Sequence, residues 1–228
     1  MKKLLLLTLF VIHSFASGFQ IPLPDTNVKS EKKEDKRYSD IISYLKEQND
    51  GESYFYLFSF YLNGSYEPDT EGKVIEKNTE LAIEYLEKAI QFNYPYATIT
   101  LGSLYLYHED FIIKENNIEL AEKYLNLALE NDVPEAYTIL ADIYFNFKED
   151  GAKAVEYLSK GAEANISTSQ YALAVIYKNG LNSEAFSLEP NEFIASKYLT
   201  DACLNNKKTK KLEELCSSDA VIKEKIGE

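Results

Sequence analysis

Few residues of this chain could act on a substrate or hold a metal ion. Of its two histidines, only His108 lies outside the apolar N-terminus, beside Glu109 and Asp110. Protein zinc sites use several His or Cys ligands at close spacing, and no Cys or second His lies near His108. The same shortage argues against Ser-His-Asp and Cys-His catalysis. We therefore predict no catalytic residue, no metal and no cofactor, and we interpret His108 as part of a solvated loop rather than of a metal site.

Carboxylates are abundant, with 37 Asp and Glu residues, and the sequence leaves a paired-carboxylate site open. Several of them lie on the polar side of predicted helices, which indicates a solvated face: Glu84, Glu87, Glu122 and Glu156. The segments Ser43 to Lys46 and Ser30 to Lys33 match the Ser-x-x-Lys pattern of penicillin-recognising enzymes. Neither is accompanied by Ser-Asp-Asn or Lys-Thr-Gly, so we interpret both matches as chance.

Two cysteines, Cys203 and Cys216, flank a basic turn at Asn205 to Lys211. In an exported chain a disulfide between them is the first interpretation, because oxidising compartments favour disulfides. Two unpaired buried thiols are the alternative.

The N-terminus predicts export. Lys2 and Lys3 precede an apolar run from Leu4 to Ile12 and then small residues, which is typical of a signal peptide over 1–18, cleaved after Ala16 or Gly18. A retained anchor helix is the alternative. The charged segment 19–37 predicts a flexible tether, with a docking segment as the alternative. We expect the mature protein to be periplasmic or secreted, without stable membrane insertion.

The net charge and the aromatic content of the chain indicate which kinds of partner it could bind. The formal net charge is −13, and an acidic chain repels nucleic acid and anionic lipid headgroups. A basic protein or peptide remains possible. The chain has no Trp but 18 Tyr and 12 Phe, so tyrosine is the main aromatic available for recognition.

A repeated frame organises the chain. Four segments carry small residues at both ends and Tyr-Leu between them at i, i+3, i+4 and i+7, which is one stripe of a helix: Ala82 to Ala89, Ala121 to Ala128, Ala154 to Gly161 and Ala195 to Ala202. We call these the B frames. Four copies in one chain indicate a repeat protein, with the stripe used for stacking.

A second frame, the A frame, precedes each B frame: Leu57 to Tyr61, Leu101 to Tyr105, Leu140 to Tyr144 and Leu173 to Tyr177. The first three B frames start 23 residues before the tyrosine of the next A frame, whereas the separation from A to B varies from 10 to 21 residues. Insertions therefore enter on one edge of the array. The constant turns contain Asn93-Tyr94-Pro95, Asp132-Val133-Pro134 and Asn165-Ile166-Ser167, which suit a tight reversal between helices.

These frames resemble the Sel1-like repeat family, relatives of the tetratricopeptide repeats. The family pattern is matched at Ala97, Leu101, Gly102, Leu104, Tyr105, Ala121, Tyr124 and Ala128, and its glycine after the first helix at Gly64 and Gly180. The resemblance implies an all-α fold, a right-handed α-solenoid of stacked antiparallel helix pairs. Some cysteine-rich members are linked to penicillin binding, but this chain lacks their cysteine pairs.

The expected organisation follows from these segments. A capping helix over 38–50, with Ile41, Tyr44 and Leu45 as its apolar stripe, precedes four repeats within 51–205 and a C-terminal capping helix over 206–228. The repeats are expected at about 51–95, 96–134, 135–167 and 168–205.

Ligand contact is expected at A-helix positions that vary between repeats, since A helices line the concave groove of helical solenoids. The candidates are Tyr54, Phe55, Thr98, Tyr137 and Tyr171. Leu57, Phe60 and Tyr61 are assigned to the core. Tyrosine gives a large contact area with few rotamers to fix. The alternative for each candidate is packing against the next repeat.

The sequence therefore predicts an exported, non-enzymatic scaffold that binds another protein, possibly a basic one. The second hypothesis is a periplasmic immunity protein that neutralises a secreted toxin. A hydrolase related to the penicillin-binding members ranks third.

Overall fold

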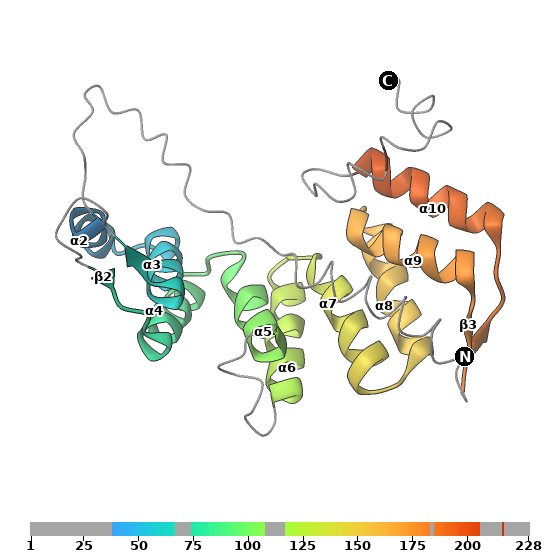
Figure 1. The fold of residues 1–228 in the computed structure, drawn as a ribbon, viewed down its shortest axis with the longest axis horizontal. Helices are drawn as coiled ribbons and strands as arrows, with labels where there is room; N and C mark the ends of the chain where they lie inside the picture. The colour runs from blue at the N-terminus through green and yellow to red at the C-terminus, as the bar shows by residue number, and fades with distance from the viewer. Residues whose placement is uncertain (1–37, 67–73, 108–116, 183–184, 206–215, 217–228) are drawn as a thin grey trace. The chain divides into compact units, whose positions relative to one another are not determined.

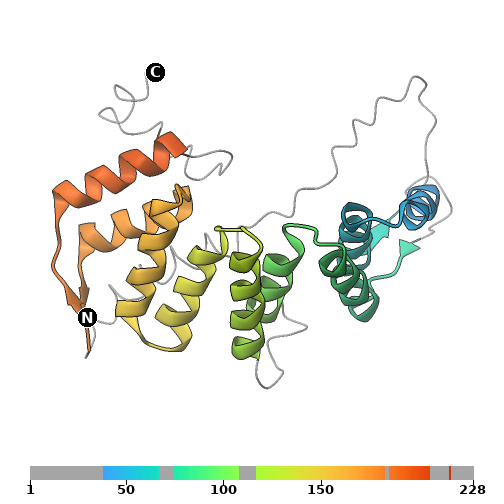
Figure 2. The same ribbon diagram turned by 180° about the vertical axis from the view of Figure 1, so that it is seen from behind.

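The computed structural model describes residues 38–66, 74–107, 117–182, 185–205 and Cys216, and these are mainly helical (Figures 1 and 2). The helices are α2 (Tyr38–Gln48), α3 (Gly51–Asn63), α4 (Thr79–Gln91), α5 (Ala97–Tyr107), α6 (Asn117–Glu130), α7 (Ala136–Asp142), α8 (Gly151–Glu163), α9 (Ser167–Asn179) and α10 (Glu192–Asn205). A π-helical turn, η1 (Ile143–Phe147), continues α7. The predicted all-α architecture of helix pairs is confirmed.

The chain divides into two compact units. The first contains α2 to α5, and its consecutive helices pack against each other. The second contains α6 to α10, and there α7 packs on α8, α8 on α9 and α9 on α10. In each unit an A helix is followed by the B helix that it contacts.

The B frames form the core, because their small ends and central leucines are shielded from solvent. Ala82, Leu86 and Ala89 are fully buried in α4, and Ala154 and Leu158 are fully buried in α8. The short side chains let the neighbouring helix approach closely, and the leucines fill the space between the helices.

The constant turns share one geometry. Asn93, Asp132 and Asn165 all have positive φ angles, of 55°, 57° and 60°, a backbone conformation that Asn and Asp adopt more readily than most residues. In each turn the next residue donates its N–H to the carbonyl at the end of the B frame, over 2.9 Å, as from Tyr94 to Ala89. One turn type thus sets the path from each B helix to the next A helix.

The connections from A helices to B helices differ in length, but those before α4, α8 and α10 end in the same backbone hydrogen bond. The residue that caps the B helix donates its backbone N–H to the carbonyl of the A-frame tyrosine: Asn78 to Tyr61 (2.8 Å), Asp150 to Tyr144 (2.8 Å) and Asn191 to Tyr177 (2.6 Å). The side chain of each cap accepts a hydrogen bond from the first turn of its helix. The connection can therefore vary in length without moving the start of the B helix.

Two long connections contain short antiparallel hairpins, β1 (Ser65–Tyr66) with β2 (Val74–Ile75) and β3 (Leu181–Asn182) with β4 (Ser187–Leu188). Each follows a glycine, Gly64 or Gly180, with φ of 69° or 74° and ψ near 170°, a region open essentially to glycine alone. The shortest connection instead follows η1, where Lys148 donates its N–H to the Ile143 carbonyl.

Helix α2 lies within the segment expected to form the N-terminal cap, but its buried face differs from the expected stripe. Ile42 and Leu45 are both 8% exposed, whereas Tyr44 is 57% exposed. The assignment of Tyr44 to the packing face is therefore wrong, because α2 is rotated so that Ile42 meets α3.

The two cysteines form a disulfide, Cys203–Cys216, with their Cα atoms 5.7 Å apart. Cys216 is buried and packs with Ala202, Leu199 and Tyr171, so the bond lies within a small apolar cluster at the end of α10.

Several expectations concern residues outside the described ranges: the signal peptide, the tether, His108, the Ser30 to Lys33 segment and most of the C-terminal capping helix. Within the described ranges, no helix is long and apolar enough to cross a membrane.

Gly161, the one glycine in a B frame, lies at a close contact of α8 with α7 and α9. A Cβ atom there would lie 2.7 Å from Ser169 Cβ and 3.1 Å from Tyr137 Cβ. We expect Gly161→Ala to lower the free energy of unfolding by about 1–3 kcal/mol, because overpacking outweighs alanine's better helix propensity. Urea unfolding followed by circular dichroism measures this loss. Ala164→Gly, at an exposed position just after the same helix, controls for backbone effects, and a stabilised Gly161→Ala variant would contradict the contact.

Candidate functional site

The candidate site is built on two tyrosines at equivalent positions of A helices, Tyr54 in α3 and Tyr137 in α7. Each lies seven residues, or two helical turns, before the A-frame tyrosine, so both tyrosines of a helix share one face. Both candidates are half-buried. They keep part of each ring accessible while their packing fixes its position.

In the first unit the B-frame tyrosine Tyr85 lies between the two tyrosines of α3. Its ring centroid is 6.1 Å from that of Tyr54 and 5.5 Å from that of Tyr61, and both pairs are stacked. We call Tyr54, Tyr85 and Tyr61 the first tyrosine stack. The Tyr54 hydroxyl donates a hydrogen bond to Asn49 Oδ1 over 2.6 Å, which further fixes the ring.

The second tyrosine stack, Tyr137, Tyr157 and Tyr144, places its rings in the same order in the second unit. The ring centroid of Tyr157 is 5.3 Å from that of Tyr144, with the rings stacked, and 6.4 Å from that of Tyr137, with the rings tilted. In the last helix pair, the A-frame tyrosine Tyr177 stacks on the B-frame tyrosine Tyr198, with 5.8 Å between their ring centroids. The frame tyrosines therefore stack across three helix pairs, and only the first and third pairs add an outer tyrosine.

Lysines lie over the rings of both stacks. Lys88 is 5.2 Å from the Tyr85 centroid, and Lys160 is 5.5 Å from the Tyr157 centroid. Each lysine also pairs with a glutamate one turn earlier in its helix, Glu84 or Glu156, over 2.7 and 2.6 Å. In the second stack Lys148 and Lys153 also lie 4.6 and 4.7 Å from the Tyr144 centroid. Both stacks thus present aromatic rings bordered by cations and anions, a mixed surface suited to a polypeptide.

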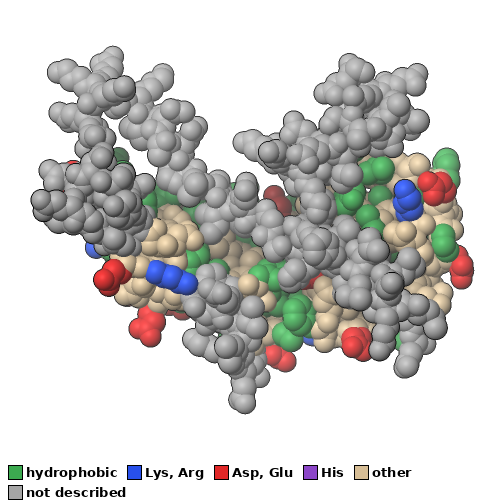
Figure 3. Space-filling view, in the orientation of Figure 1, with side chains coloured by type: hydrophobic (Ala, Val, Ile, Leu, Met, Phe, Trp, Pro, Cys, Tyr) green, Lys and Arg blue, Asp and Glu red, His purple; other side chains and the backbone are tan. Residues whose placement is uncertain are grey.

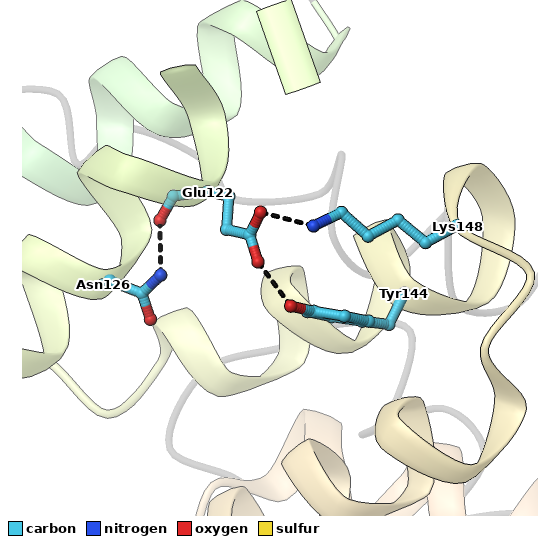
Figure 4. A network of polar contacts seen from close by, with 4 residues as sticks. All are labelled: Glu122, Asn126, Tyr144 and Lys148. Carbon is cyan, nitrogen blue, oxygen red and sulfur yellow. Dashed lines mark hydrogen bonds and ion pairs between the residues drawn. The ribbon is translucent and has the colours of Figure 1, made fainter. Parts of the chain in front are cut away.

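A polar network supports the second stack (Figure 4). Glu122 in α6 accepts hydrogen bonds from the Tyr144 hydroxyl and from Lys148 Nζ, each over 2.5 Å. Partial burial alone would raise the pKa of Glu122, but the bonds from Lys148 and Tyr144 outweigh it and hold the pKa below its usual value. The network ties α6 to the π-helical turn, and π-turns often occur at functional sites.

Glu122 therefore differs from its predicted role. Its side chain is 20% exposed, whereas those of Glu84 and Glu156 are 57% and 55% exposed and lie in the expected solvated positions. No sequence pattern marks this contact, because it joins residues of different helices.

Two of the predicted contact residues are buried, and for them the prediction is wrong. Phe55 is fully buried, with its ring 4.8 Å from that of Tyr94, and Thr98 is only 2% exposed. Tyr171 is half-buried against the disulfide cluster, and burial raises its pKa. These three side chains pack within the array, and Tyr54 and Tyr137 keep accessible rings.

Within the described ranges, no group of three or more His, Cys, Asp or Glu side chains could hold a metal ion. The polar groups of the stacks are tyrosine hydroxyls and paired lysines and glutamates, which suit recognition of another molecule.

Comparisons with known proteins agree with this architecture. A family model described as the Sel1 repeat matches residues 51–91, 95–133, 134–166 and 167–206. A Sel1 repeat protein from Oxalobacter formigenes has a similar structure, with a TM-score of 0.55 and 23% identity over 72% of this chain. The aligned part is 62% of that protein, so this chain spans less than two thirds of its length.

A second solved structure, an immunity protein from Pseudomonas aeruginosa, aligns with 91% of this chain and 74% of its own length. The TM-score is 0.48 and the identity 16%. No protein of curated function matches this chain in sequence. At 23% identity, the structure from Oxalobacter formigenes supports the fold alone.

Proposed function

The chain belongs to the Sel1 repeat family, and from this premise we propose that it is an exported, non-enzymatic scaffold that binds another protein through its A-helix face. Tyr54 and Tyr137 are the proposed contact residues, on what we propose to be the concave side of the array. Repeat proteins of stacked helix pairs generally use such extended faces for binding.

The observation that carries this proposal is the pair of tyrosine stacks. An outer tyrosine recurs at the same position in α3 and α7, half-exposed and fixed by neighbouring rings. A pre-positioned tyrosine offers a large contact area and loses little conformational entropy on binding. The frame tyrosines alone would suffice for stacking, as Tyr177 and Tyr198 illustrate.

Export is part of the same proposal. It rests on the signal-like sequence of residues 1–18 and on the Cys203–Cys216 disulfide, a bond that persists in oxidising compartments. The partner would then be another protein of the cell envelope or of the surroundings.

A second candidate function, neutralisation of a secreted toxin in the periplasm, is favoured by the net charge of −13, which suits a basic enzyme as partner. Immobilised mature protein should capture one basic hydrolase from envelope extract if this candidate is right. Several envelope proteins would favour the general scaffold, and no captured protein would contradict both.

We expect Tyr54→Ala and Tyr137→Ala to weaken binding of the captured partner about tenfold or more, as for central aromatic residues of interfaces. Both rings are half-exposed, so the melting temperature should fall by only a few degrees. Titration calorimetry and thermal unfolding measure the two effects. Phe147→Ala, at a 42% exposed position outside the stacks, serves as the matched control. A large loss of stability with unchanged affinity would reassign both tyrosines to the core.

A further inference from the structure

A second aromatic surface lies on the turn between α4 and α5. Phe92 is 47% exposed and Tyr96 is 37% exposed, and the half-buried Tyr94 lies between them in sequence. The Phe92 ring is 5.4 Å from that of Tyr54, so this surface continues from the first tyrosine stack. We call Phe92, Tyr94 and Tyr96, together with Tyr54, the turn-edge surface.

The residues at the equivalent positions of the other two constant turns indicate which of these aromatic side chains the turn requires. The position of Tyr94 is apolar in every turn, as Val133 and Ile166, and Tyr94 packs on the buried Phe55. The positions of Phe92 and Tyr96 are polar or small in the other turns: Asn131, Glu135, Ala164 and Thr168. The same turn geometry forms without those two aromatic side chains, so the turn does not require them.

The turn beneath this surface is closely packed. Asn93 adopts a positive φ, and the backbone of Gly51 lies directly beneath the turn. A Cβ atom on Gly51 would lie 3.0 Å from Tyr94 Cβ and 3.2 Å from Phe92 Cβ. Large aromatic side chains supported by close packing are common in binding hot spots.

The charges beside this surface indicate what would bind. Glu52, at the start of α3, is exposed, accepts a hydrogen bond from Tyr56 and directly follows Gly51, whose backbone packs against Tyr94 and Phe92. The nearby lysine, Lys88, is paired with Glu84. On the part of the described residues visible in Figure 3, acidic side chains appear at several separate places.

We infer that the turn-edge surface binds an arginine- or lysine-bearing, otherwise apolar segment of the partner protein. The rings would receive the aliphatic stem and the cation, and Glu52 would pair with its charge. The chain itself uses this chemistry, since Lys88 lies 5.8 Å from the Tyr54 centroid. The inference rests on the proposed protein-binding function and adds the chemistry of the partner.

The test uses the full chain and two labelled synthetic peptides, one of alternating arginine and leucine and its twin of alternating glutamate and leucine. Fluorescence anisotropy should show binding of the arginine peptide alone. The double variant Phe92→Ala/Tyr96→Ala, which keeps the net charge, should raise its Kd about tenfold or more, and Glu52→Gln should raise it severalfold. Phe193→Ala, at an 82% exposed position in α10, should leave the Kd unchanged.

An unchanged Kd in the double variant would reduce the effect to general attraction between opposite charges and would overturn the inference. Binding of the glutamate peptide, or failure of the arginine peptide to bind, would do the same. The proposed function is tested separately, because a captured partner that is released by Tyr137→Ala but retained by Phe92→Ala/Tyr96→Ala would preserve that function and refute only the turn-edge surface.

Discussion

Replacing Leu86 with alanine is expected to lower the free energy of unfolding by about 2–5 kcal/mol. Leu86 is the central leucine of the first B frame, fully buried in α4 where α4 packs on α3. Truncation removes most of its apolar surface and leaves a cavity that two packed helices can only partly close. Leu125, equally buried in α6, should behave in the same way.

Urea unfolding followed by circular dichroism measures the loss, and Glu87→Ala is the matched control. Glu87 is exposed on the same helix, so its replacement should change stability by no more than about 0.5 kcal/mol. A loss at Leu86 as small as this would mean that the B frame does not form the core and would remove the basis for the stacking of the first pair.

The sequence predicts the parts of the fold that recur. Small residues and leucines at helical spacing mark the buried stripe, and Asn or Asp before Tyr, Val or Ile marks the constant turn. Both depend on local rules that repeat in phase, and the structure places both as expected. The caps at Asn78, Asp150 and Asn191 were also accessible to sequence reasoning, since each lies four residues before the first small residue of a B frame.

The sequence does not predict the parts that depend on a single connection. The strands β1 to β4 have two residues each, too few for an alternating pattern. The π-helical turn at η1 occurs where the connection is shortest, and no local pattern marks it.

The sequence predicts only part of the candidate site, because helix packing decides which side chains are accessible. Tyr54 and Phe55 are adjacent aromatics, and only the 100° rotation between consecutive helical residues decides which of them is buried. A signal existed, because the positions equivalent to Phe55 include Ile99 and Thr138, which are also buried. The contact of Glu122 with Tyr144 and Lys148 joins different helices, so only the packed structure reveals it.

Removing the Cys203–Cys216 disulfide is expected to lower the free energy of unfolding by about 3 kcal/mol, the chain-entropy value for a loop of this length. The bond closes a segment with a sequence separation of 13. Of the residues of α10, only Ala195 and Ala202 are buried, whereas Phe193 and Leu204 are exposed. The bond joins the end of α10 to Cys216, which packs with Ala202, Leu199 and, in α9, Tyr171. Its removal should therefore loosen the contact between α9 and the end of α10.

Which helices lose stability tests this account more sharply than how much stability the protein loses. In an array where each element contacts only its neighbours, weakening one end should increase local opening there and leave the other end unchanged. Hydrogen exchange of Cys203→Ala/Cys216→Ala should therefore be faster in α9 and α10 and unaltered in α3 and α4, and chemically reduced wild-type protein should behave like the variant.

A thiol assay should find no reactive thiol in the native protein and two after reduction. Faster exchange spread evenly over all helices would show that the bond stabilises the chain as a whole, and two reactive thiols in the native protein would show that the pair is not bonded in solution.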